Sequence, residues 1–110
     1  MTKWDYPWEK LYKACLAVIG SPERPQQRLR RAAWELSVLL RTAEIPDEGL
    51  RKRMEQLVAT CTRNPNQGEG TMEATTSQMT DDKAGDLLQE VLDIFAEVAE
   101  LRALESQHLH

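Results

Sequence analysis

The sequence predicts an all-α protein, a small antiparallel bundle of about four helices in a single domain over residues 1–110. Alanine, leucine, glutamate, arginine and glutamine dominate the composition, while β-branched and aromatic residues do not gather into the alternating runs that strands need. Apolar residues recur instead at helical spacing in four segments, expected at 4–19, 23–44, 47–63 and 81–104. A chain of 110 residues with 41% hydrophobic residues can bury one modest core.

A glycine and a proline-containing start signal separate the first two predicted helices. Gly20 suits the left-handed residue that follows many helix ends. Ser21 can cap the second helix with Pro22 in its first turn, and Pro25 also allows a later start. The first helix carries its core stripe at Trp4, Trp8, Leu11, Tyr12, Cys15, Val18 and Ile19. The second carries its core stripe at Leu29, Ala32, Ala33, Leu36, Leu39, Leu40 and Ala43.

The third and last helices are also bounded by recognisable signals. Pro46 ends the second helix and Asp47 caps the third, which has apolar residues at Leu50, Met54, Leu57, Val58 and Cys61. Residues 64–80 are polar, rich in glycine, threonine and serine, and without a period, which predicts a long flexible loop. Thr80 then caps the last helix, and residues 105–110 are expected to form a frayed tail. The last helix carries a row of apolar residues at steps of 4 and 3, the spacing of a coiled-coil seam, at Leu87, Val91, Ile94, Val98 and Leu101. Leu88 and Phe95 widen this seam.

Trp34 lies on the side of the second helix opposite its core stripe. A surface helix usually carries one apolar stripe, so a second stripe with an aromatic residue indicates a contact surface. The candidate partner-binding site comprises Trp34, Val38, Ile45, Arg30, Arg31 and Arg41. Three interpretations remain open: burial inside the monomer, with Trp4 and Tyr6 as possible covers, self-association, or binding of a different protein.

Basic and acidic residues are unevenly distributed along the chain. The first 63 residues hold 12 basic against 8 acidic residues, and the remainder holds 2 against 10, for a net charge of −4. The two parts can neutralise each other within one bundle or across a dimer. Basic residues at the start of the third helix give a likeness to a helix-turn-helix, so one alternative is a nucleic-acid-binding regulator. It would use Arg28, Arg51, Lys52 and Arg53.

A second alternative arises from acidic residues on the last helix. Glu90, Asp93, Glu97 and Glu100 recur at spacings of 3, 4 and 3, and helical nucleotide pyrophosphohydrolases hold magnesium with acidic pairs of this kind. The companion acidic cluster on an earlier helix is absent from this sequence. The two histidines, His108 and His110, have no third ligand near them. We therefore expect no metal, no cofactor and no enzymatic activity.

The remaining signals concern the compartment and the oligomeric state. Cys15 and Cys61 fall on apolar faces and are expected to be reduced core residues. The chain has no apolar run of roughly 20 residues and no secretory signal, which predicts a cytoplasmic protein without membrane contact. We interpret the chain as a non-catalytic protein–protein interaction or regulatory adaptor module. A homodimer is expected because the last-helix seam and the Trp34 stripe exceed what three short helices can cover.

Overall fold

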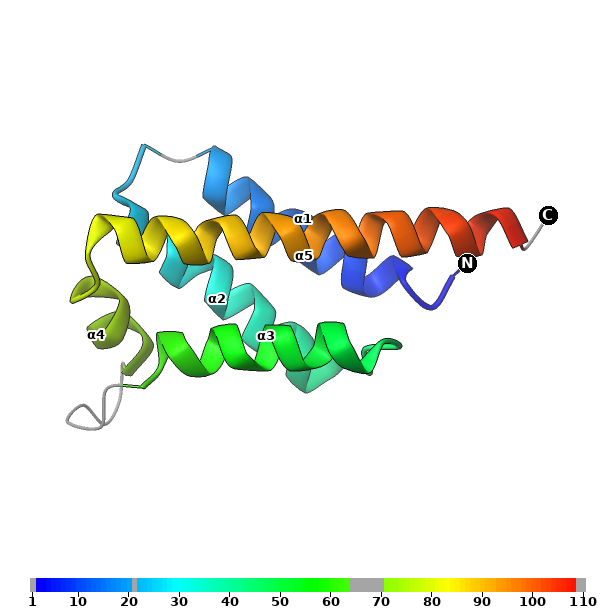
Figure 1. Ribbon diagram of the computed structural model, residues 1–110, viewed down its shortest axis with the longest axis horizontal. Coiled ribbons are helices and arrows are strands. Elements are labelled where there is room, and N and C mark those ends of the chain that lie inside the picture. The colour runs from blue at the N-terminus through cyan, green and yellow to red at the C-terminus, as the bar shows by residue number, and fades with distance from the viewer. Residues whose placement is uncertain (1, 21, 64–70, 109–110) are drawn as a thin grey trace.

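The computed structural model describes residues 2–20, 22–63 and 71–108, and within them the chain forms five α-helices and no strand. The helices are α1 (Asp5–Ile19), α2 (Pro25–Thr42), α3 (Glu48–Cys61), α4 (Thr71–Ser77) and α5 (Asp81–His108) (Figure 1). The all-α prediction is confirmed. The expected number of about four helices is one short, because α4 lies inside the segment predicted to be a loop.

Polar side chains cap two of the helices as the sequence predicts. The Asp47 carboxylate accepts a hydrogen bond from the Leu50 amide at 2.9 Å at the start of α3. The Thr80 hydroxyl accepts one from the Lys83 amide at 3.1 Å at the start of α5. Both caps act between residues three apart, so the local sequence is enough to reveal them.

Other predicted helix ends are wrong by a few residues. α2 begins at Pro25, the later of the two starts that the sequence allows, with the Gln27 side-chain oxygen accepting from the Arg24 amide at 3.3 Å. The proposed cap at Ser21 lies outside the described residues. Gly20 has φ −100°, so it does not occupy the left-handed region expected of it. α5 continues to His108 instead of ending at 104, and the rest of the predicted tail, 109–110, lies outside the described residues.

The helices form a flat, elongated body of 50 × 27 × 17 Å. α5 runs along its length, α1 and α3 run in the opposite direction, and α2 crosses behind them (Figure 1). α2 is the central element, since it contacts each of the other four helices. None of the helices in the described part of the chain has the length and apolar content required to cross a membrane.

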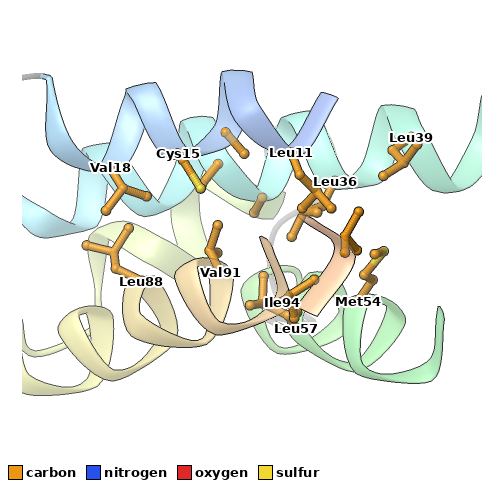
Figure 2. Packing of buried hydrophobic residues seen from close by; sticks show 14 of the residues in the cluster. Leu11, Cys15, Val18, Leu36, Leu39, Met54, Leu57, Leu88, Val91 and Ile94 are labelled. Carbon is orange, nitrogen blue, oxygen red and sulfur yellow. The ribbon is translucent and has the colours of Figure 1, made fainter. Parts of the chain in front are cut away.

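One core joins α1, α2, α3 and α5. Figure 2 shows side chains from all four helices converging, including Leu11, Leu36, Met54 and Val91. Val91, Ile94 and Val98 of the predicted seam have no exposed surface within the single chain. The centre of the seam is therefore covered within the single chain, while Leu87 and Leu101 at its ends are half-buried and Trp34 of the second stripe stays exposed.

The short helix α4 packs against α2, and a buried glutamine on α2 holds the segment that follows it. The Gln26 side-chain amide donates to the Met79 carbonyl at 2.9 Å and to the Asp81 carboxylate at 2.8 Å, which joins the start of α2 to the start of α5. Thr76 is fully buried, and Met72 and Met79 pack against the core. These contacts explain why residues 71–77 are helical rather than part of a loop. The first part of the predicted loop, 64–70, lies outside the described residues.

Candidate protein-binding surface

Trp34 projects from the outer side of α2 and is 54% exposed. The guanidinium carbon of Arg41, two helical turns further on, lies 5.4 Å from the centroid of the Trp34 ring. The Arg41 Nε also donates to the Ser37 carbonyl at 3.3 Å, and the Ser37 hydroxyl donates to the Trp34 carbonyl at 2.8 Å. A cation stacked over an exposed indole contributes about 0.5–1 kcal/mol, so the two side chains hold each other in place.

The other predicted members of the site divide between surface and core. Val38 is half-buried beside Trp34, whereas Ile45 is only 5% exposed and belongs to the core. The prediction that Ile45 extends the outer stripe is wrong because α2 ends at Thr42 and the backbone at Ala43 is extended, so the helical spacing stops before residue 45. We call Trp34, Val38 and Arg41 the α2 surface.

Two further arginines lie at the N-terminal side of the α2 surface. Arg31 pairs with Glu23 at 2.8 Å, and its side chain remains 54% exposed. Arg30 is half-buried and lines a cavity of about 100 Å³ between α2 and α4. Both arginines therefore lie near the site, but only Arg41 touches the indole ring.

The N-terminal aromatic residues do not cover Trp34. Trp4 is 4% exposed and belongs to the core. Tyr6 forms a hydrogen bond of 2.9 Å between its hydroxyl and that of Thr42. Of the three interpretations of Trp34, burial inside the monomer is therefore wrong.

The basic residues of the predicted nucleic-acid site are engaged within the chain. The Arg28 guanidinium donates to the Val18 carbonyl at 3.1 Å. Arg51 pairs with Glu55 at 2.8 Å and with Glu48 at 3.4 Å, and Lys52 lies 3.8 Å from Glu48. These contacts offset much of the positive charge at the start of α3.

Arg53 is the most strongly engaged of these cations. It donates to both oxygens of Glu90, at 2.8 and 3.3 Å, and to Glu97, all across the gap between α3 and α5. These hydrogen bonds raise the pKa of Arg53 above its ordinary value. The expectation that basic and acidic parts of the chain neutralise each other is confirmed at this point.

The same contacts occupy the predicted magnesium ligands. Glu90 and Glu97 bind Arg53, and Asp93 accepts a hydrogen bond from the Gln89 side chain at 3.0 Å. Among the described residues, no group of three or more metal-ligating side chains is placed to hold an ion. His110 and the side chain of His108 lie outside that description.

A second exposed apolar surface lies on α1, where Tyr12 and Ile19 were predicted in the core stripe and Leu16 was not part of any prediction. Tyr12, Leu16 and Ile19 are 45%, 47% and 70% exposed, and we call them the α1 surface. From Trp8 to Ile19, the apolar residues of α1 larger than alanine span an arc of about 160°, from Val18 to Leu16. An ordinary surface helix carries a narrower stripe, so the width of this arc is a signal that part of it faces outward.

The two cysteines behave as predicted. Cys15 and Cys61 are buried and form no disulfide. Burial disfavours the thiolate and raises the pKa of Cys15 to about 11 and that of Cys61 to about 12. Neither thiol is suited to act as a nucleophile at neutral pH.

Over the residues that the structure describes, the chain is all-helical and has two exposed apolar surfaces that contain aromatic side chains, one on α1 and one on α2. No protein-family model, curated protein or solved structure matches this chain. Its function is therefore argued from these two surfaces.

Proposed function

We propose that this chain is a non-catalytic protein–protein interaction module of the cytoplasm that self-associates. Its α2 surface binds a different protein, the partner. The observation that carries the proposal is the Trp34 indole, more than half exposed and stacked under Arg41. Tryptophan and arginine supply a large share of the binding energy at protein interfaces. A partner that covers this indole gains apolar burial that folding of the chain alone leaves unused.

The charge around Trp34 defines the partner further. α2 carries four arginines and one glutamate, and Arg31 and Arg41 remain exposed on its outer side. An acidic partner segment would place carboxylates beside these guanidinium groups while an apolar side chain packs on the indole. The partner of the α2 surface is accordingly an acidic protein segment with at least one large apolar residue.

Affinity capture from a lysate with the wild type and two variants tests this function. Trp34→Ala removes the apolar anchor, and Arg41→Glu reverses the charge above it. Leu104→Ala is the matched control, because Leu104 is another exposed apolar residue, 46% exposed, on α5. Proteins retained by the wild type and the control should be lost from both variants while helix content by circular dichroism stays constant. Retention of the same proteins by Trp34→Ala would contradict the proposal.

A further inference from the structure

Positive charge lies on both sides of the Trp34 indole along α2. Arg30 precedes Trp34 by one turn and Arg41 follows it by two turns. The Arg41 guanidinium reaches back over the ring, with its Nε 3.3 Å from the Ser37 carbonyl, so this charge lies about one turn after Trp34. In the described part of the chain, neither arginine forms an ion pair with an acidic side chain. Both charges are therefore available to a second molecule.

The outer side of α5 carries negative charge at a matching spacing. Asp93, Ala96 and Glu100 are 3 and 4 residues apart, which places them on one side of the helix, and all three are exposed. We call them the α5 surface. The printed contact of Asp93 is with the neutral amide of Gln89, so its charge is not offset. Ala96 lies between the two acids, and its small side chain leaves room for a large ring.

The α2 and α5 surfaces match when Trp34 lies against Ala96. A helix rises about 1.5 Å per residue, so the two acids lie about 4.5 and 6 Å from the level of Ala96, one on each side. Arg30 lies about 6 Å to one side of Trp34, and the Arg41 guanidinium lies on the other side, near Ser37. One acid therefore faces each guanidinium group, whether the two helices run parallel or antiparallel.

The overall charges of the two helices agree with this match. α2 contains four arginines and one glutamate, whereas α5 contains eight acidic and two basic residues. The two helices pack on each other inside one chain, so their outer sides face away from each other. The α5 surface therefore cannot reach the α2 surface of its own chain, but it can reach that of a second copy.

We propose that self-association places the α5 surface of one molecule on the α2 surface of the next, where it competes with the partner for Trp34. This inference rests on the proposed function and adds the location of the self-contact and the regulation of the partner site. The contact joins two different surfaces, so it is head-to-tail and does not have to stop at two molecules. A partner with a large apolar residue buries more of the indole than Ala96 does, and it therefore displaces the second copy.

Light scattering over a range of protein and salt concentrations tests the contact. The wild-type mass should rise with protein concentration and fall with added salt, because opposite charges hold the contact together. Asp93→Lys/Glu100→Lys should weaken association about tenfold or more. Asp82→Lys/Asp86→Lys is the matched control, because it makes the same change of charge on α5 but lies beyond either end of α2 when Trp34 faces Ala96.

Three outcomes of this experiment would overturn the contact. The first is a wild type that stays monomeric at every concentration. The second is an equal loss of association in the variant and in its matched control, since the effect would then follow the net charge alone. The third is loss of association in Leu16→Glu, which would place self-association on the α1 surface.

Mixing two charge-reversed variants tests whether the contact is head-to-tail. Arg30→Glu/Arg41→Glu makes both surfaces acidic, and Asp93→Lys/Glu100→Lys makes both surfaces basic. Each variant alone should be a folded monomer by light scattering and circular dichroism. An equal mixture should associate, because each surface of one variant then meets its opposite on the other. A mixture that stays monomeric would contradict the pairing of α2 with α5.

Affinity capture separates this inference from partner binding at α2. Asp93→Lys/Glu100→Lys leaves the α2 surface intact and should retain more of the captured proteins than the wild type, because no second copy competes. Equal capture would contradict the competition. If capture depends on Trp34 while the wild type is monomeric, partner binding at α2 stands and this inference fails. If the copies associate through α2 and α5 but Trp34→Ala captures the same proteins, the contact stands and partner binding at α2 fails.

Discussion

Arg53 of α3 crosses to α5 and hydrogen-bonds both Glu90, at 2.8 Å, and Glu97. The two helices pack on each other less extensively than either packs on α2. A cavity of about 180 Å³ lies between them, lined by Arg53, Gln56, Leu57, Thr60, Leu87 and Glu90. Arg53 thus spans a gap that apolar side chains leave open, and it joins the basic part of the chain to the acidic last helix.

Removal of this bridge is expected to destabilise the fold by a small but measurable amount. Arg53→Ala should lower the free energy of unfolding by about 1 kcal/mol and the melting temperature by roughly 4 °C. The effect is small because the side chains of Arg53, Glu90 and Glu97 are all partly exposed. Thermal melts at low and high salt check this, since added salt should reduce the difference. Arg51→Ala is the control, as Arg51 pairs only within α3. Equal losses in the two variants would argue against a bridge between the helices.

The Asp5 carboxylate is expected to make stability fall in acid. Hydrogen bonds from Arg102 and Thr2 lower its pKa from 3.8 to about 2. Between these values the unfolded chain binds a proton that the folded chain resists, so the stabilisation is present above about pH 4 and is lost as the pH falls towards 2. Melting temperatures from pH 2 to 6 should show that Asp5→Asn flattens this part of the profile. In Arg102→Ala, the Asp5 pKa measured by NMR should return towards 3.8; an unchanged value would contradict the assigned cause.

The two cysteines are expected to be unreactive in the folded protein and to weaken it in alkali. Their pKa values are raised to about 11 and about 12, whereas an unfolded thiol ionises near 9. Stability from these thiols is therefore complete below pH 9 and declines as the pH rises through the folded values. A thiol reagent at pH 8 should label neither residue until denaturant is added. Rapid labelling of the native protein would show that Cys15 or Cys61 is exposed.

Ile45 and Val38 should respond differently to truncation although both were predicted on one outer stripe. Ile45→Ala should cost about 2–4 kcal/mol because Ile45 is in the core. Val38→Ala should cost less than about 1 kcal/mol because Val38 is half-buried on the outer side of α2. Urea denaturation of both variants measures these costs. Similar losses would mean that the two side chains share one environment.

The local parts of this fold were predictable. Apolar residues at helical spacing located four helices, and the caps at Asp47 and Thr80 located two of their starts. The outward direction of Trp34 also followed from its position relative to Leu36, because both lie in one uninterrupted helix. Each of these features depends on residues a few positions apart.

The features that were missed depend on residues far apart in the chain. α4 has too few residues to show a period, and the segment that follows it is held by a contact between Gln26 and Met79, 53 positions away. Ile45 is the exception, a local error, because the helical spacing used to place it stops at Thr42. Charge alone predicted that the acidic last helix can neutralise the start of α3, but only the fold shows that Glu90 and Glu97 are the residues that pair with Arg53.

The sequence by itself determined that this chain is helical, where most of its helices begin, and which apolar residues share a helix face, including a second stripe on α2. Only the tertiary structure decided which apolar residues are covered: the centre of the α5 seam is buried, while Tyr12, Leu16 and Ile19 on α1 and Trp34 on α2 remain exposed. The physical reason is that helix formation depends on spacing along the chain, whereas burial depends on which helices pack together.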